Sequence, residues 1–503
     1  MSSRSPDEIR TGARAYGPEA GGRPEPADPH ELLHRARRLT SHRHPRAGSA
    51  WERAAAALVR AGGTLTPGDH ADALDSTALD CRGAARPAAQ PLFFRAADLH
   101  ERAGRRGKAL VSRARAVLAG PEPGATALAR LTELCERAGL LHSLGQAGAA
   151  ETATVRLLRG RARADLLHTA PDPAAEAGAL REELTRLIAF TGRHPADGAM
   201  PGVRADTRAL LGRITAPDDP AAALTHLRAA AEEHRAGGRP WQAAEHELVL
   251  AALLRATGAP EEAAALLRAA LGSEAPGSPL QASDRARLCL ALARAVAEPG
   301  GRRPAAGGPG AEDEELSLLA EAAGQADGPA QDVHVGALAR LRLGVAHAER
   351  GRCREASVLL DEALTGFAED GDGAARVRAR AWLAECALRL GEPELAAREY
   401  ARAAAEARSW DDGSHAAALS GRAAYALGAA AGTPEEAASA HERAADDTDP
   451  AAGPGPGDAW PWLRALPEPC GPQGPYQVNV YGEVGGPGPR PGGAPVNRVQ
   501  GCV

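Results

Sequence analysis

One short segment of this chain carries residue types that could do metal chemistry, His30-Glu31-x-x-His34. On a helix, two histidines four residues apart lie on one face and can bind zinc, while the glutamate between them acts as a general base. The context favours another interpretation, because residues 32–39 have the leucine and alanine spacing of an ordinary core-facing helix stripe. A zinc metalloprotease is therefore a minor alternative, and we expect neither a bound metal nor a cofactor.

No other candidate for catalysis has the spacing that its chemistry needs. The segment 104–108 (GRRGK) hints at a phosphate-binding loop, but Arg102 stands where the first glycine belongs and Ala109 replaces the serine or threonine. The seven cysteines are scattered and form no Cys-x-x-Cys pair, which is typical of reduced intracellular thiols. The sequence therefore predicts a protein that is not an enzyme.

The composition indicates an all-α protein that needs neither nucleic acid nor membrane. Aromatic residues make up 3% of the chain, and the dominant alanine, leucine and arginine are good helix formers. A net charge of −6 with interspersed signs gives no basic face for nucleic acid. The sequence shows no signal-peptide pattern and no apolar run of the ~18 residues that a membrane helix needs, so we expect a cytoplasmic protein. Lys108 is the only lysine, a usage that indicates a high-GC bacterial genome.

A recurring turn gives the strongest signal. Three sites have the pattern Gly-x-Pro-Glu-x-Ala, and four looser versions keep glycine and alanine five residues apart. Glycine can adopt the left-handed conformation that ends a helix, and proline fits the first position of the next helix. Glutamate in that first turn complements the helix dipole, and alanine lets the two helices pack closely. The full turns begin at Gly258, Gly391 and Gly432, and the looser ones at Gly104, Gly145, Gly238 and Gly351.

The residues around three of these turns keep one spacing. Two small or apolar residues stand eight and seven positions before the glycine, and alanine, a bulky residue and alanine follow five, nine and twelve positions after it. The three units are Leu343, Gly344, Ala356, Leu360 and Ala363; Leu383, Ala384, Ala396, Tyr400 and Ala403; and Leu250, Ala251, Ala263, Leu267 and Ala270. This spacing resembles the tetratricopeptide repeat, most clearly over residues 236–446. The resemblance implies an α-solenoid, which for this length means about twenty helices.

We expect five segments along the chain. They are a disordered leader (1–28), a divergent helical-repeat array (29–297), a Gly/Pro linker (298–310), tetratricopeptide-like repeats (311–446) and a disordered Pro/Gly-rich tail (447–503). Within the tail, residues 476–503 carry valine and tyrosine in alternation on both sides of a Gly/Pro loop. This segment could form a short β-hairpin or add a strand to the edge of a partner's sheet.

The resemblance also implies a function, the binding of a peptide or protein partner by a scaffold or regulatory protein. An alternative is the sensory helical subunit of a transcriptional or defence-type signalling system whose output belongs to another chain. In the family, first-helix residues 13, 10, 6, 3 and 2 positions before the turn glycine line the concave surface. Arginines there would bind carboxylates through paired hydrogen bonds, and leucines beside them suit an acidic, hydrophobic peptide. The predicted partner-binding charges are Glu349, Arg378, Glu385, Arg389 and Arg422.

Overall fold

Helices form where the segments rich in alanine, leucine and arginine run uninterrupted, and they end at glycine and proline. A computed structural model of the chain describes residues 28–41, 47–80, 86–122, 124–194, 198–272, 280–297, 309–330, 332–370, 372–408 and 414–430. These residues contain nineteen α-helices and no strand. The expected all-α fold is confirmed.

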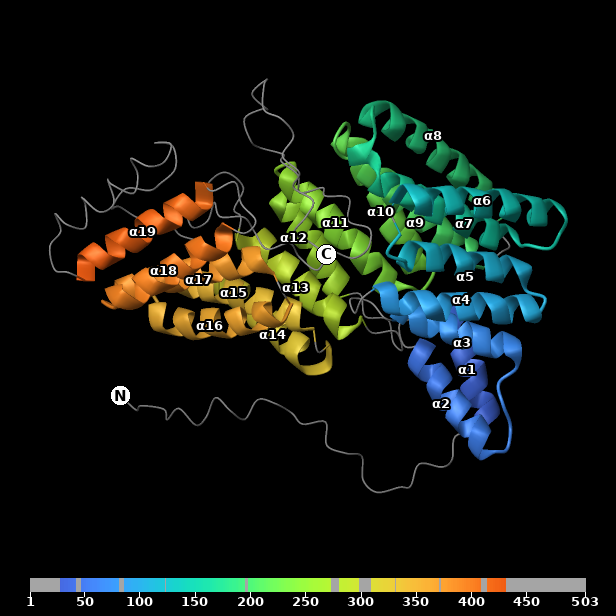
Figure 1. Cartoon of the computed structure of the whole chain (residues 1–503), viewed down its shortest axis with the longest axis horizontal. Coiled ribbons are helices and arrows are strands. Elements are labelled where there is room, and N and C mark those ends of the chain that lie inside the picture. Colours follow the sequence, from blue (N-terminus) through green and yellow to red (C-terminus); the bar gives the residue numbers. More distant parts are fainter. Residues whose placement is uncertain are drawn as a thin grey trace.

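The helices are named by their order in the chain (Figure 1). Their bounds are α1 Pro29–Ser41, α2 Ala47–Arg60, α3 Pro67–Asp80, α4 Arg86–Arg102, α5 Arg106–Ala119, α6 Gly124–Ser143, α7 Ala149–Asp165, α8 Pro173–Gly192, α9 Met200–Thr215, α10 Pro220–Ala236, α11 Pro240–Ala256, α12 Pro260–Gly272, α13 Ala282–Ala297, α14 Pro309–Gln325, α15 Val333–Glu349, α16 Cys353–Asp370, α17 Gly373–Arg389, α18 Pro393–Ala407 and α19 Ser414–Ala430. A short 3-10 turn, Leu167–Thr169, follows α7, and a π-helical turn, Ala326–Ala330, follows α14.

Nearly every helix packs on the next one, and most odd-numbered helices also contact one another. The helices α5, α7 and α9 stack in turn, and so do α11, α13, α15 and α17. Odd-numbered helices are therefore the first helices of successive hairpins, since the repeats of a solenoid contact only their neighbours. The molecule is an α-solenoid with α1 at one end and α19 at the other (Figure 1). We call residues 29–236 (α1–α10) the N-terminal stack and residues 240–430 (α11–α19) the C-terminal stack.

The predicted glycine turns are confirmed wherever the structure describes them. Six of the predicted glycines have positive φ angles, between 68° and 81°, and Gly62 makes a seventh such turn that the sequence pattern missed. In each turn, the amide after the glycine donates to a carbonyl near the end of the preceding helix, as Glu392 does to Ala387 over 2.9 Å. The six are Gly104, Gly145, Gly238, Gly258, Gly351 and Gly391. The turn at Gly432 lies outside the described residues.

These turns occupy two different places in the repeat, which the sequence pattern did not distinguish. In the C-terminal stack, Gly258, Gly351 and Gly391 each connect the first helix of a hairpin to the second. Gly104, Gly145 and Gly238 instead follow even-numbered helices and connect one hairpin to the next. The sequence pattern is the same at both places, because both kinds of connection need the same left-handed residue to end a helix.

The hairpin of α9 and α10 keeps the register but lacks the turn glycine. In α9 and α10, a Cβ atom on Gly212 would lie 2.9 Å from Cγ of Leu227, the same close approach that Gly344 makes to Leu360 in α15 and α16. Its turn, residues 216–219, contains no glycine, and Asp219 caps α10 by accepting a hydrogen bond from the Ala222 amide over 3.0 Å. The register of small and bulky residues therefore marks the hairpins more reliably than the turn glycine does.

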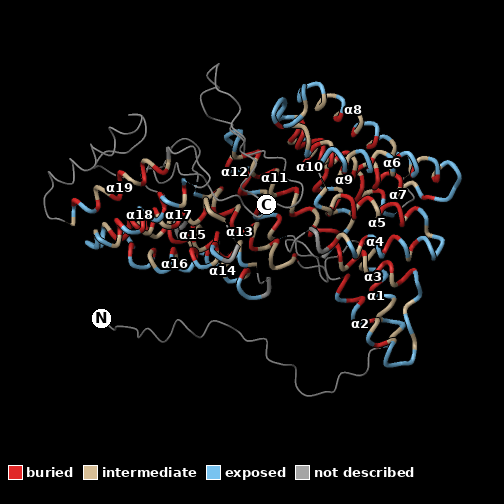
Figure 2. Tube along the Cα trace, viewed as in Figure 1, coloured by how far each residue is buried: buried red, intermediate tan, exposed pale blue. Residues whose placement is uncertain are grey.

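The core follows the predicted register. The alanines and bulky residues that follow Gly258, Gly351 and Gly391 are all buried, and buried residues line the inner faces of the helices (Figure 2). Residues of α13, among them Ala286 and Cys289, belong to the same apolar cluster as α15–α19, so the packing continues across residues 298–308. Of the predicted linker, 298–308 lie outside the described residues, while Pro309 and Gly310 begin α14.

Two further predictions concern the ends of the chain and a membrane. The leader, apart from Asp28, and the tail from residue 447, with its predicted hairpin over 476–503, lie outside the described residues. Within the part of the chain that is described, every helix is too short or too polar to cross a membrane.

Candidate binding groove

Two of the predicted partner-binding charges are core residues. Arg422 on α19 is 3% exposed, and one of its Nη atoms donates to Glu385 Oε2 on α17 over 2.6 Å. The same carboxylate oxygen accepts a hydrogen bond from the Tyr400 hydroxyl over 3.0 Å. The expectation that Glu385 and Arg422 line an exposed surface is wrong, because α18 and α19 close over them. These residues join α17, α18 and α19 instead.

The other three predicted charges are accessible to different degrees. Arg389 is exposed at the end of α17, with its Nε atom 3.3 Å from Glu385 Oε1. Glu349 and Arg378 line a groove of about 150 Å³ on the first-helix side of α13–α17. Beside them lie Leu338, Leu341 and Val345, which stand 13, 10 and 6 positions before Gly351, where the family places concave-surface residues. The structure therefore brings two of the five charges to one groove, although Leu338 and Leu341 are buried rather than exposed.

Charges around this groove already have partners within the protein. Glu315 accepts a hydrogen bond from Arg350 over 2.6 Å, and Arg342 donates to the Leu290 carbonyl over 3.2 Å. Both Glu315 and Arg342 line the groove. The groove between α13 and α17 is small. Glu315 and Arg342 use their hydrogen bonds to hold parts of the protein together.

The His30-Glu31-x-x-His34 segment lies at the exposed start of α1. Both histidines and the glutamate are exposed, while Leu32 and Leu33 pack against the apolar cluster of α1 and α2. The two histidines form no group of three metal donors with any other histidine, cysteine, aspartate or glutamate that the structure describes.

Lys108, from the rejected phosphate-loop pattern, donates to Asp72 Oδ1 over 2.7 Å and so connects α5 to α3.

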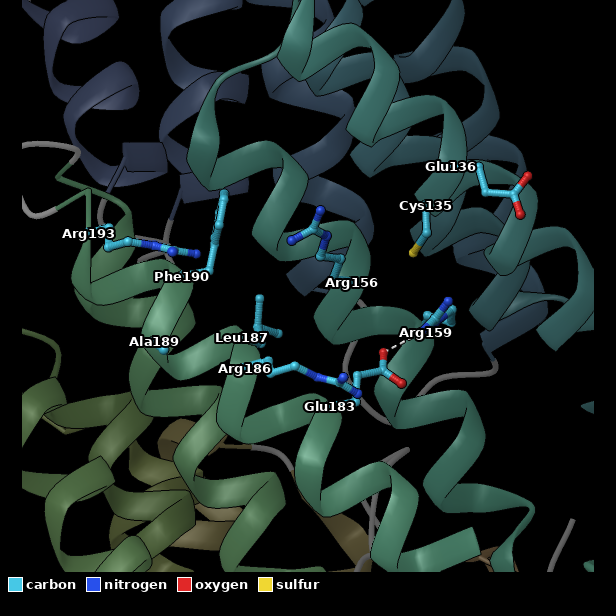
Figure 3. A pocket seen from close by; sticks show the side chains of 10 residues that line it. All are labelled: Cys135, Glu136, Arg156, Arg159, Glu183, Arg186, Leu187, Ala189, Phe190 and Arg193. Atoms are coloured by element: carbon cyan, nitrogen blue, oxygen red, sulfur yellow. Dashed lines mark hydrogen bonds and ion pairs between the residues drawn. The ribbon is translucent and has the colours of Figure 1, made fainter.

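A larger groove lies in the N-terminal stack, between α6 and α8 with α7 between them. It has a volume of about 610 Å³. Figure 3 shows how the side chains from the three helices surround it. The lining residues are Cys135 and Glu136 of α6, Arg156 and Arg159 of α7, and Glu183, Arg186, Leu187, Ala189, Phe190 and Arg193 of α8 and its end.

The sequence of α8 explains why its polar face lines the groove. Asp172 caps the helix by accepting a hydrogen bond from the Ala175 amide over 3.0 Å, and Pro173 occupies its first position. Leu180, Leu184 and Leu187 recur at intervals of three and four and are buried against α7 and α9. A spacing of four and three residues also relates Arg186, Phe190 and Arg193, so these three share a second face of α8. This face lies next to the leucine face and borders the groove.

The arginines of the groove differ in whether they have carboxylate partners. Arg159 and Arg163 both form ion pairs with Glu183, and Arg163 also pairs with Glu176. Arg156, Arg186 and Arg193 form no ion pair with any described residue, and the last two are exposed. The groove therefore presents three guanidinium groups whose hydrogen-bond donors are available to a ligand.

Phe190 lies beside two of these arginines. The guanidinium carbon of Arg156 is 5.0 Å from the centre of the Phe190 ring, and that of Arg193 is 6.0 Å away. His194 and His142 contact the same ring, with centroid distances of 4.9 and 5.9 Å. Cation–π contacts of this kind hold guanidinium groups over a ring without using their hydrogen-bond donors. The cluster combines one apolar surface with cations that still can bind an anion.

The only thiol in the groove is unreactive. Cys135 is buried, and this burial raises the pKa of its thiol to about 11, so the thiol stays protonated at neutral pH. Its Sγ atom donates to the Val155 carbonyl over 3.5 Å. The groove can therefore bind a ligand through its arginines and Phe190, but Cys135 does not supply a nucleophile.

The hairpin register identifies the kind of repeat. Small residues of the first helices face bulky residues of the second helices, in α9–α12 and α15–α18 alike, and the first helices stack on one another. The chain is a divergent tetratricopeptide-like solenoid.

Sequence reasoning missed the groove between α6 and α8, because α6–α8 lack the full turn motif. A signal was present in Arg186, Phe190 and Arg193, since the whole chain has only four phenylalanines.

Comparisons with known proteins add little to this description. No family model and no curated protein matches the chain. Among solved structures, the apo form of RapI is similar with a TM-score of 0.48 and 12% identity, over 70% of this chain and 86% of that one. A signal transduction ATPase with a tetratricopeptide repeat sensor, from Pyrococcus horikoshii, has a TM-score of 0.48 and 13% identity, over 72% and 53%. BtubC from P. vanneervenii has 0.36 and 17%, over 54% and 96%. None of these similarities bears on what the chain binds.

Proposed function

We propose that this protein is a non-catalytic scaffold or regulatory protein whose groove between α6 and α8 binds an acidic, hydrophobic segment of a protein partner. The observation that carries the proposal is a set of three arginines that line the groove without carboxylate partners among the described residues: Arg156 and Arg193 beside the Phe190 ring, and Arg186 one helical turn before it on α8. A solvated arginine surface alone would not support it. The ring and the groove add an apolar site at which a ligand side chain can lose its contact with water.

The chemistry of the groove favours carboxylates on the partner. A guanidinium group binds a carboxylate through two parallel hydrogen bonds, and such charge-assisted bonds are about twice as strong as neutral ones. Arg156 and Arg193 are held near Phe190, which reduces the side-chain entropy that binding removes. A volume of about 610 Å³ lies within the range of about 300–1,000 Å³ that ligand pockets have. The groove therefore suits two or three side chains of a peptide.

The groove between α13 and α17 is a second, weaker candidate surface. Glu349 and Arg378 remain proposed contacts there, and the exposed Arg389 remains a proposed contact outside this groove. Glu385 and Arg422 act through the core and not as direct contacts. Strand pairing through residues 476–503 also remains a prediction, and these residues lie outside the described part of the chain.

A peptide series tests the proposed function from the ligand side. Three fluorescent peptides of equal length would alternate phenylalanine with glutamate, glutamine or lysine, and fluorescence anisotropy with the full-length protein would measure their binding. We expect the glutamate peptide to bind at least tenfold more tightly than the glutamine peptide, and its affinity to fall with added salt, because ion pairs at an exposed groove are screened. Glutamine binding equal to glutamate binding, or preference for lysine, would show that the arginines do not select the ligand.

A further inference from the structure

Three metal-binding residue types meet where the N-terminal stack joins the C-terminal stack. Asp206 lies on α9, His234 near the end of α10 and His246 on α11, so three successive helices contribute one residue each. Nε2 of His234 is 3.1 Å from Asp206 Oδ1, and Nε2 of His246 is 3.7 Å from the same oxygen. The two imidazole rings stack with centroids 5.2 Å apart. One potential donor atom from each residue lies within 4.8 Å of the other two.

The cluster is buried, and its polar atoms are not all satisfied. His234 is 0% exposed and His246 is 5% exposed. Neither ring nitrogen of His246 makes a hydrogen bond to any described residue, and Nδ1 of His234 makes none either. A buried nitrogen without a partner loses its hydrogen bonds to water and gains nothing in return. Packing alone does not explain two histidines at this place, because apolar residues of similar size would fill the same space without the loss of hydrogen bonds to water.

From this placement, we infer that Asp206, His234 and His246 form a site for one divalent transition-metal ion, for which zinc is the first candidate. Zinc takes imidazole and carboxylate ligands at about 2.0–2.2 Å in tetrahedral geometry, which sets two ligand atoms about 3.3–3.5 Å apart. The separations of Asp206 Oδ1 from Nε2 of His234 and of His246, 3.1 and 3.7 Å, lie on either side of that value. Two histidines and one carboxylate are also a set that transition metals prefer over magnesium or calcium.

The surroundings prepare the carboxylate for this role. Arg161 approaches the second oxygen of Asp206, with 3.6 Å between its Nη2 atom and Oδ2, which leaves Oδ1 facing the histidines. Outer contacts of this kind orient ligands in metal sites.

Nearby positive charge limits how tightly the ion is held. Arg239 is 5% exposed and lies beside the cluster, where Gly202 makes room for it: a Cβ atom at Gly202 would be 1.8 Å from its Nη1 atom. Its charge and that of Arg161 oppose a divalent cation, and three protein ligands leave one position for water. We therefore expect an exchangeable ion rather than a permanent one. Bound metal would tie α9 and α10 to α11 next to the turn at Gly238, and so would stiffen the connection between the two stacks.

Zinc titration of the full-length protein without an affinity tag tests the site. Competition with a chromophoric chelator would measure stoichiometry and affinity, and thermal unfolding with and without zinc would measure the coupling to folding. We expect one equivalent of zinc and a concentration-dependent rise in Tm. Asp206→Asn and His246→Leu should each weaken zinc binding by at least ~100-fold, more than the ~10–100-fold that loss of an outer contact costs.

The matched control is the pair of exposed histidines on α1. The double variant His30→Ala, His34→Ala should keep the same zinc affinity and the same rise in Tm as the natural chain. Should His246→Leu unfold, Asp206→Asn and the cobalt absorption spectrum of the natural chain decide the question, because tetrahedral cobalt absorbs strongly in the visible range. Absence of saturable binding, unchanged affinity in Asp206→Asn, or loss of binding in the α1 double variant would each overturn the assignment.

Discussion

The two grooves of this solenoid differ in what their charged side chains do. In the C-terminal stack, where the repeat motif is strongest, Glu315 and Arg342 bind other parts of the protein, and Glu385 and Arg422 are buried together. In the N-terminal stack, where the motif is weakest, Arg156, Arg186 and Arg193 have no carboxylate partner among the described residues. The groove there is also about four times as large, about 610 Å³ against about 150 Å³.

Packing explains this difference. In a well-formed repeat the second helix packs closely on the first, so small residues contact bulky ones. Charged residues between the two helices then contact partners within the protein. The helices α6 and α8 both pack on α7, and the space between them is the groove (Figures 1 and 3). Departure from the motif therefore marks the surface that is available for binding, whereas agreement with the motif marks the part that is stably packed.

The largest expected effect breaks the buried pair of the C-terminal stack. Arg422→Leu should lower the free energy of unfolding by about 3–5 kcal/mol, because it leaves the Glu385 carboxylate buried with only Tyr400 and the partly exposed Arg389 near it. Chemical denaturation followed by circular dichroism would measure this loss. Arg186→Ala, in the groove of the N-terminal stack, should change the same free energy by less than about 0.5 kcal/mol.

A double variant separates the charge from the packing at that pair. Glu385→Gln together with Arg422→Met removes both charges and keeps an acceptor for the Tyr400 hydroxyl, so it should recover at least half of the loss. A cost for Arg422→Leu as small as that for Arg186→Ala would mean that Arg422 is solvated, and the contrast between the two stacks would disappear.

The second effect concerns acid and belongs to the N-terminal stack. His100 on α4 is 0% exposed and makes no hydrogen bond to any described residue, with Asp72 at 3.8 Å and Arg105, Lys108 and Arg115 nearby. Burial lowers the pKa of His100 to about 4. The unfolded chain therefore takes up a proton near pH 6.5 that the folded chain does not take up until about pH 4.

The stability that neutral His100 provides is thus complete above pH 6.5 and is lost as the pH falls towards 4. The loss is at most about 3.5 kcal/mol, since the pKa falls from 6.5 to about 4 and one pKa unit corresponds to about 1.4 kcal/mol. The difference in unfolding free energy between His100→Leu and the natural chain should move in favour of the variant by about 2 kcal/mol or more between pH 7 and pH 4.5. A difference that does not change with pH would contradict the burial of a neutral histidine.

The third and smallest effect tests what the two stacks share. Gly145→Ala and Gly391→Ala should each cost about 1–2 kcal/mol, because both glycines have left-handed φ angles, 68° and 79°, that alanine adopts only with strain. Gly139→Ala is the control, since Gly139 lies inside α6 with nothing near its Cβ position, and it should stabilise the protein by about 0.5–1 kcal/mol. A harmless Gly145→Ala would show that the turns of the two stacks are built differently.

Much of the fold could be predicted from sequence, because its signals are local. Glycine at a left-handed turn, proline at a helix start and alanine facing leucine each act within a few residues, and the turns from Gly104 to Gly391 were found that way. The α9–α10 hairpin escaped notice because Asp219 and Pro220 make its turn without glycine. The position of Gly104, Gly145 and Gly238 between hairpins was also missed, since it depends on which helices stack.

The candidate sites could be predicted only in part, because they depend on burial by distant residues. Counting back from Gly391 pointed to Arg378, which lines the groove between α13 and α17, but it could not show that α19 brings Arg422 onto Glu385. The Asp206 cluster joins residues up to 40 positions apart on three helices, which no short motif contains. Sequence spacing found the exposed histidines of α1 instead, because a motif is defined along the chain and not across the fold.

The most direct test of the account compares two charge reversals with the same change in net charge. One variant carries Arg156→Glu, Arg186→Glu and Arg193→Glu in the N-terminal groove, and the other carries Arg294→Glu, Arg342→Glu and Arg378→Glu in the C-terminal groove. Each would be measured for anisotropy with the glutamate–phenylalanine peptide and for Tm. We predict that the first variant loses peptide binding and keeps its Tm within a few degrees, while the second keeps peptide binding below its Tm but unfolds at a lower temperature. Loss of binding in the second variant, with binding intact in the first, would contradict the account.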